Sequence, residues 1–158
     1  MPDLRRLFIG LLTSLLLSSA VCADEAGLGV LIGSPTGITG KIWQGEHRAV
    51  DAAAGWSLGD SSSFYFHADY LFQQPREFVV SEGKLPYYYG VGLRLRNDNE
   101  TRLGVRMPLG IEYLLQDAPL SIFIEMALVL DIVPRTALDV NAGVGVRYRF
   151  LLKRRRAV

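Results

Sequence analysis

The chain has 158 residues, and its 17 Lys and Arg residues against 16 Asp and Glu residues give a formal net charge of only +1. A balance so close to zero provides no strongly basic surface, so we expect no nucleic-acid partner. The single cysteine cannot form a disulfide within the chain, which leaves packing and hydrogen bonding to stabilise the fold. The length fits one domain.

The N-terminus has the pattern of a secretory signal. Arg5 and Arg6 form a short basic start, residues 7–17 are apolar, and small residues lead up to Ala23. The apolar run is far shorter than the about 20 residues that a membrane-spanning helix needs. We therefore expect residues 1–23 to be a signal peptide that is removed. Without its two arginines and one aspartate, 15 basic and 15 acidic residues remain.

The rest of the chain alternates apolar residues with polar residues or glycine, which is the period of a β-strand. In residues 141–150, for example, an apolar face from Ala142 to Phe150 alternates with a face of Asn141, two glycines and two arginines. Eight such strands are expected, at 27–33, 38–43, 50–58, 64–72, 85–96, 102–115, 120–132 and 141–150. Because most connections are short, the pattern predicts an up-and-down antiparallel meander.

Eight strands of this kind can close into a barrel in two ways. The apolar face can point inward around a ligand, as in soluble lipocalin-like barrels, or outward to lipid. Glycines such as Gly92, Gly104 and Gly145 lie on the polar face, where they make room for long side chains in a narrow lumen. The long rows of apolar residues in the later strands and the aromatic residues near strand ends also fit strands that cross a bilayer. We therefore predict an all-β, eight-stranded antiparallel up-and-down transmembrane β-barrel over residues 24–150, followed by a basic C-terminal tail at 151–158.

This orientation assigns charged side chains to the lumen and apolar side chains to lipid. The predicted lumen charge network is Lys41, Asp51, His67, Asp69, Arg94, Arg96, Arg102, Arg106, Glu112, Glu125, Asp131, Arg147 and Arg149. The residues predicted to face lipid in the last two strands are Ile124, Met126, Leu128, Val144, Val146, Tyr148 and Phe150. An arginine turned toward lipid near the midplane costs about 2–4 kcal/mol, so Ile124→Arg should block assembly. Ser121→Arg should be milder if the lumen has room.

Three segments, at residues 33–41, 82–92 and 118–131, resemble a family of uncharacterised small bacterial outer-membrane β-barrel proteins. More loosely, the architecture is similar to the eight-stranded OmpA and OmpX type. The resemblance implies an outer-membrane location and a last strand, ending near the aromatic Phe150, that is read by the barrel-assembly machinery. The family carries no established chemistry that could be transferred to this chain.

The sequence contains two candidate groups for catalysis or metal binding. His67 and Asp69 share the inward face of one strand and could pair as a base and its orienting carboxylate, with Ser57 or Ser121 as the nucleophile. We interpret the pair instead as a structural hydrogen bond within the lumen. Asp98 and Glu100 are interpreted as solvated loop residues. No catalytic residue, metal site or cofactor is therefore expected.

The resulting hypothesis is a small, monomeric outer-membrane barrel in contact with outer-membrane lipids, with a structural role in membrane integrity. One alternative is a soluble periplasmic lipocalin-like barrel that binds an apolar ligand. Further alternatives are a narrow pore and an outer-membrane lipid hydrolase.

Overall fold

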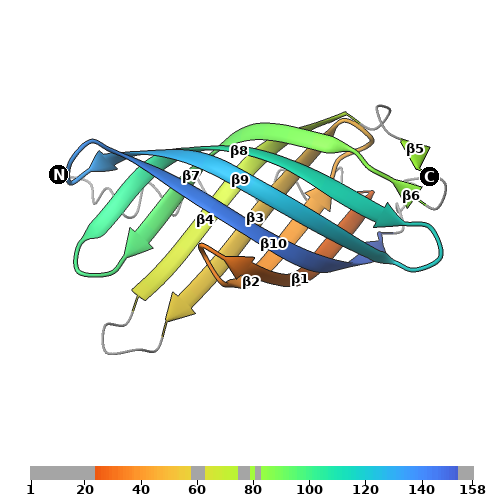
Figure 1. Ribbon diagram of the computed structural model, residues 1–158, viewed down its shortest axis with the longest axis horizontal. Coiled ribbons are helices and arrows are strands. Elements are labelled where there is room, and N and C mark those ends of the chain that lie inside the picture. The colour runs from red at the N-terminus through yellow and green to blue at the C-terminus, as the bar shows by residue number, and fades with distance from the viewer. Residues whose placement is uncertain (1–23, 58–62, 75–78, 81–82, 153–158) are drawn as a thin grey trace, which may run out of the picture.

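A computed structural model describes residues 24–57, 63–74, 79–80 and 83–152 (Figure 1). The predicted signal peptide, the loop at 58–62 and the basic residues 153–156 lie outside the described residues. Eight long strands are present: β1 (Glu25–Gly33), β2 (Gly37–Trp43), β3 (Arg48–Ser57), β4 (Ser63–Gln74), β7 (Tyr87–Asn97), β8 (Thr101–Leu115), β9 (Leu120–Val133) and β10 (Ala137–Leu151). Two short strands, β5 (Val79–Val80) and β6 (Gly83–Lys84), lie between β4 and β7. Within these ranges no helix has the length and apolar character needed to span a membrane.

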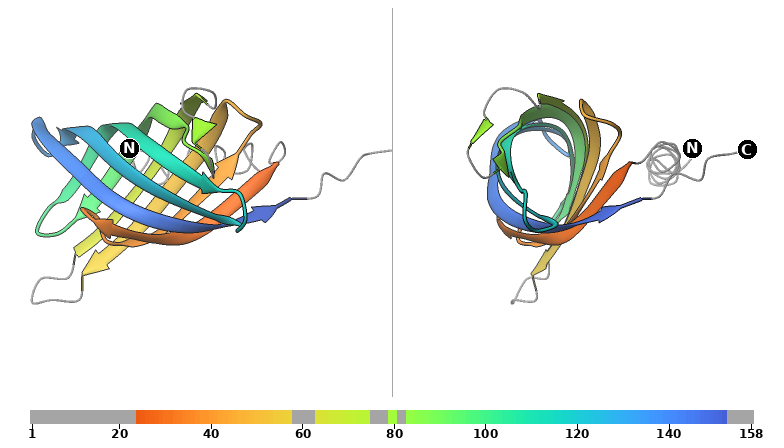
Figure 2. Two further views of the ribbon diagram at one scale, coloured as in Figure 1. Left: turned by 45° about the vertical axis from the view of Figure 1, so that its right-hand side comes forward. Right: turned by 90° about the vertical axis from the view of Figure 1, so that its right-hand side faces the viewer.

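The eight long strands close on themselves. Each is antiparallel to its neighbours, and β1 pairs with β10 from Glu25 opposite Leu151 to Gly33 opposite Gly143. Viewed along its axis, the barrel is a complete ring of strands (right-hand view of Figure 2). The predicted eight-stranded up-and-down barrel is therefore confirmed. Because β1 begins and β10 ends at the same rim, we call this rim the terminal end and the other rim the opposite end.

The short strands extend one side of the wall at the terminal end. Lys84 of β6 lies opposite Leu114 of β8, in the same register that places Tyr87 of β7 opposite Ile111. Strand β6 therefore continues the line of β7 beyond a break at Leu85 and Pro86. Both short strands lie within residues 73–84, between the predicted strands 64–72 and 85–96, where the sequence predicted no strand.

The last strand begins earlier than predicted. Strand β10 starts at Ala137 rather than Asn141, and it ends at Leu151, one residue beyond the predicted barrel boundary. Residues 137–140 continue the alternation, with Leu138 exposed on the outside and Asp139 on the same side of the strand as Asn141. The four added residues pair with the end of β9, from Ala137 opposite Asp131 onward.

Besides a register shift between β8 and β9, the pairing of the wall is interrupted between β7 and β8. Pairing between β7 and β8 runs to Tyr89 opposite Leu109, and resumes with Gly92 opposite Arg106. Pro108 lies in this gap, and proline has no backbone N–H to give to a neighbouring strand. The same proline is paired on its other side with Ala127 of β9, so the wall stays continuous there.

The two faces of the wall differ sharply in chemistry. Along β9, Ile122 to Ile132 are exposed at every second position, with Ile124 at 63% exposure, whereas the residues between them, including Phe123 and Glu125, are buried. Exposed aromatic residues gather toward both rims, with Trp56 and Phe64 at the opposite end. At the terminal end the exposed aromatic residues are Phe72, Tyr89, Tyr148 and Phe150. The outer face is thus an apolar band bordered by aromatic side chains.

Glycines on the inner face make room for large side chains directly across the strand pair. Gly110 lies opposite Tyr88, and a Cβ on it would come within 2.4 Å of the Tyr88 ring. Gly145 lies opposite Phe123, where a Cβ would come within 2.3 Å of that ring. Both glycines adjoin aromatic rings, because a side chain lies first against the residue opposite it in the neighbouring strand. Other inner-face glycines make room for long side chains as expected: Gly29, Gly92 and Gly104 lie directly opposite Arg147, Arg106 and Arg94.

The charged interior of the barrel

Most of the charged residues predicted for the lumen are buried inside the barrel. Those with at most 5% exposure are Lys41, Asp51, His67, Asp69, Arg94, Arg106, Glu112, Glu125, Asp131 and Arg147. The other three, Arg96, Arg102 and Arg149, are partly exposed near the rims. The seven residues predicted to face lipid, Ile124, Met126, Leu128, Val144, Val146, Tyr148 and Phe150, are all exposed on the outer face.

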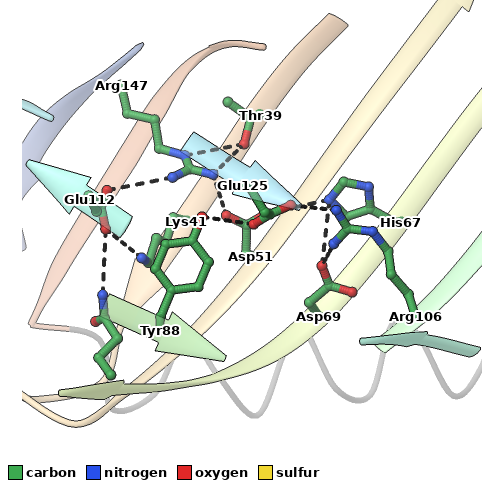
Figure 3. A network of polar contacts seen from close by, with 11 residues as sticks. Thr39, Lys41, Asp51, His67, Asp69, Tyr88, Arg106, Glu112, Glu125 and Arg147 are labelled. Atoms are coloured by element: carbon green, nitrogen blue, oxygen red, sulfur yellow. Dashed lines mark hydrogen bonds and ion pairs between the residues drawn. The ribbon is translucent and has the colours of Figure 1, made fainter. Parts of the chain in front are cut away.

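Ten of the buried side chains form what we call the central cluster: Thr39, Lys41, Asp51, His67, Asp69, Tyr88, Arg106, Glu112, Glu125 and Arg147 (Figure 3). Within it, Lys41 Nζ donates to Glu112 Oε2 at 2.6 Å. The same ammonium lies 4.5 Å from the centre of the Tyr88 ring and 5.1 Å from that of Trp43. A buried ammonium is costly unless it is paired, and here a carboxylate and two aromatic faces surround it.

Arg147 of β10 makes polar contacts with three other strands, β2, β3 and β8. Its Nη2 donates to Thr39 Oγ1 at 2.8 Å and also to Asp51, and its Nη1 lies 3.5 Å from Glu112 Oε1. The guanidinium carbon lies 3.6 Å from the centre of the Phe123 ring. Such a planar, permanently charged group can contact carboxylates at its edge and a ring at its face at the same time.

Arg106 of β8 bridges two carboxylates from different strands. Its Nη1 donates to Asp69 of β4, and its Nη2 donates to Glu125 of β9. The second oxygen of Glu125 accepts a hydrogen bond from Tyr88 Oη at 2.8 Å. Removal of one partner from such a buried set leaves an uncompensated charge, which typically costs about 3–5 kcal/mol. The contacts therefore hold β4, β8 and β9 in a defined register.

A second group, the distal cluster, lies nearer the opposite end and consists of Tyr65, Arg94, Asp131, Asp139 and Asn141. Arg94 Nη2 donates to both oxygens of Asp131 at 2.6 and 2.7 Å, and its Nη1 donates to Asp139 Oδ2 at 2.6 Å. Tyr65 Oη donates to Asn141 Oδ1 at 2.7 Å. The cluster thus joins β4, β7, β9 and β10 across the interior.

The rims carry looser ion pairs. At the terminal end Arg149 pairs with Glu25. At the opposite end Arg96 Nε lies 2.9 Å from Asp98 Oδ2, and Arg102 approaches Asp98 Oδ1 at 4.0 Å. Burial opposes ionisation of Asp98, but the backbone N–H of Glu100 and the two guanidinium groups outweigh it and lower the pKa of this carboxyl group.

Each end also has an open pocket. The one at the terminal end has a volume of about 430 Å³ and is lined by residues that include Glu25, Leu114 and Arg149. The one at the opposite end has a volume of about 320 Å³ and includes Tyr65 and Arg96 in its lining. Neither of these two pockets is lined by a residue of the central cluster.

Several interior partners were not in the predicted network: Thr39, Tyr65, Gln73, Tyr88, Asp139 and Asn141. Most are polar or aromatic residues that alternate with the outward apolar residues. The period of two therefore places them on the inward face, together with the predicted charges. Asp139 was missed because the last strand was predicted to begin too late.

The candidate catalytic pair does not have a nucleophile bonded to it among the described side chains. Nε2 of His67 lies 3.7 Å from Asp69 Oδ2 and 3.6 Å from Asp51 Oδ1. Ser121 Oγ is buried and forms no hydrogen bond with His67. A serine nucleophile needs its base within hydrogen-bond reach, so this serine does not complete a catalytic set with the His67 and Asp69 pair. The side chain of Ser57 lies outside the described set.

A closed eight-stranded barrel with an apolar outer band and charged residues paired inside has the fold of a transmembrane β-barrel. No protein-family model and no curated protein matches the sequence. Among solved structures, the barrel is similar to the N-terminal β-barrel domain of Pseudomonas aeruginosa OprF, with a TM-score of 0.57 and 8% sequence identity. The match covers 81% of this chain and 98% of that chain. At this identity the similarity establishes the fold, and it agrees with the expected eight-stranded architecture.

Proposed function

We propose that the chain is a small outer-membrane β-barrel protein with a structural role in the membrane and an interior plugged by charged side chains. One observation supports this proposal most directly: large apolar residues are exposed around the outside, while the paired charges lie inside. Exposed apolar surface on this scale is unfavourable in water and favourable in lipid. The similarity to the OprF barrel domain supports the same location.

The soluble lipocalin-like alternative requires the reverse arrangement. A cavity for an apolar ligand is lined by apolar side chains. The interior of this barrel contains Lys41, Arg94, Arg106 and Arg147 instead, all with at most 2% exposure. The apolar-ligand hypothesis therefore has no observation in its favour among the described residues.

The expected partners are lipids and the barrel-assembly machinery. The exposed outer face of β10, which includes Val144 and Phe150, supplies both a lipid contact and an aromatic residue near the strand end. We propose that the assembly machinery recognises this last strand and that the finished barrel is a monomer. No enzyme activity is proposed, because the only candidate base lacks a bonded nucleophile in the described part of the chain.

Membrane location is tested by fractionation of cells that express the untagged chain. We expect the protein to stay in the outer-membrane fraction after a high-salt wash and to migrate differently on gels with and without boiling, because the closed barrel resists detergent. Protein that remains monodisperse in buffer without detergent would refute the proposal.

The plugged interior is tested in planar lipid bilayers. We expect the purified barrel to show no steady conductance, because the paired side chains of the central cluster are buried inside the barrel and line neither of the two end pockets. A general porin in the same bilayer serves as the positive control. Reproducible ion currents at a fixed unit size would replace the plug with a narrow pore.

A further inference from the structure

Two carboxylates of the central cluster lie directly opposite each other on neighbouring strands. Asp51 of β3 is directly opposite Asp69 of β4 in the strand register, and both carboxylates point inward. His67 lies two residues before Asp69 on the same face of β4. Like charges at directly opposed positions destabilise a sheet, so positive charge is needed near them. Arg147 pairs with Asp51 and Arg106 with Asp69, and both carboxylates also approach His67.

The imidazole of His67 sits at this point (Figure 3). Its Nε2 is 3.6 Å from Asp51 Oδ1 and 3.7 Å from Asp69 Oδ2, and the three atoms all lie within 4.8 Å of one another. Separations of this size are too long for good hydrogen bonds. Metal–ligand bonds of about 2.0–2.2 Å with tetrahedral angles would place neighbouring ligand atoms roughly 3.3–3.6 Å apart. Shifts within the reach of side-chain rotation would therefore complete a coordination site.

The cluster also has unused capacity for a cation. It contains four carboxylates, on Asp51, Asp69, Glu112 and Glu125, against the three basic side chains Lys41, Arg106 and Arg147. Two buried atoms of the proposed ligand residues, Asp69 Oδ1 and His67 Nδ1, have no hydrogen-bond partner among the described residues. An unpartnered carboxylate oxygen in a closed interior is unfavourable unless a cation or a water molecule contacts it.

We propose that Asp51, His67 and Asp69 bind a divalent transition-metal ion of the zinc class inside the barrel. One imidazole nitrogen with two carboxylates is a donor set that suits Zn²⁺ and leaves a fourth position open. This proposal departs from the sequence-based expectation of no metal site. That expectation weighed Asp98 and Glu100 as a cation site and treated His67 and Asp69 only as a catalytic pair, without Asp51 of the neighbouring strand.

The neighbouring arginines are compatible with a bound ion. Arg147 contacts Asp51 through Oδ2, which leaves Oδ1 facing His67. Arg106 contacts Asp69 through Oδ2, and each carboxylate oxygen can accept from more than one direction. The two guanidinium groups would act as outer partners that orient the ligating carboxylates.

The test uses Co²⁺, whose visible absorption reports coordination number, with untagged barrel refolded in detergent. The chain has two histidines, and His47 lies exposed between β2 and β3, so it provides a matched control. We expect one Co²⁺ per barrel with a four-coordinate spectrum, which is lost in His67→Gln and retained in His47→Gln. Added Zn²⁺ should displace the Co²⁺ and raise the urea midpoint of the wild type, since a ligand that binds only the folded state stabilises it.

Three results would overturn the proposal: no Co²⁺ bound by the wild type, equal binding by His67→Gln, or an unchanged urea midpoint when Zn²⁺ or a chelator is added to the wild type. The last measurement needs no variant, so it decides the matter even if His67→Gln fails to fold. Metal binding does not depend on the proposed membrane role. A soluble barrel with one bound ion would refute the proposed location and leave the metal site standing.

Discussion

At the scale of single residues, the interior is filled by large side chains that lie against glycines on the neighbouring strand. The same relation recurs for Tyr88 with Gly110, Phe123 with Gly145, Asp69 with Gly92 and Asp131 with Gly104. In a narrow barrel, a position without a Cβ leaves room for the side chain opposite it. The glycines are therefore part of the packing of the charged interior.

Gly110→Ala should destabilise the barrel by about 1–3 kcal/mol, because the new methyl group would overlap the Tyr88 ring. The urea midpoint of detergent-folded protein measures this change. Gly40→Ala is the control, since its Cβ would meet no atom closer than 3.7 Å. In a double-mutant cycle with Tyr88→Ala, the cost of Gly110→Ala should largely disappear. Equal costs with and without the Tyr88 ring would show that the ring is not the cause.

At the scale of one strand, alternation decides which substitutions a position tolerates. Ser121 and Ile124 lie on opposite faces of β9. The sequence suggested that Ser121→Arg would be the milder change, but Ser121 has no exposed surface and lies opposite Arg147. A second guanidinium there would meet a filled interior and a like charge. We now expect Ser121→Arg to be severe.

Depth along β9 should matter on the outer face. Ile124→Arg places a charge near the middle of the strand and should cost about 2–4 kcal/mol, whereas Ile132→Arg near its end should cost about 0–1 kcal/mol. The two isoleucines have similar exposure, 63% and 57%, so burial does not distinguish them. Refolding yield into lipid vesicles, read from the boiling-dependent gel shift, measures the difference. Equal yields would argue against a bilayer around this face.

At the scale of the whole molecule, closure between β1 and β10 removes the two edges that an open sheet would have. Every long strand then has hydrogen-bonded neighbours on both sides, and proline is normally confined to sheet edges and bulges. The one proline within a long strand, Pro108, lies where the β7 and β8 pairing is interrupted. We therefore expect the closed barrel wall to tolerate few other prolines.

Val146→Pro should prevent closure, because Val146 lies between Val30 of β1 and Ile122 of β9. Proline removes a ladder hydrogen bond and is found in sheets essentially only at edges or bulges, and the interior of the β1–β10 seam is neither. We expect the variant to lose the boiling-dependent shift and to be degraded by added protease. Thr136→Pro, in the exposed turn before β10, should fold normally. Protease resistance in Val146→Pro would mean that the seam is not needed for closure.

The sequence alone determined the eight long strands and the two faces of each, because an alternation of period two is a local property that needs no knowledge of neighbours. It also identified most of the charges that lie on the inward face. It could not determine the pairs, since Arg94 with Asp131 and Lys41 with Glu112 are far apart in the chain and meet only across a closed ring.

The tertiary structure alone decided three features. It set the strand register that puts several large interior groups against glycines, and the early start of β10 that brings Asp139 to Arg94. It also placed Asp51 beside His67 and Asp69. The physical reason is the same in each case: distances across a barrel depend on how strands are staggered around the ring, and stagger is a property of the closed sheet and not of any one strand.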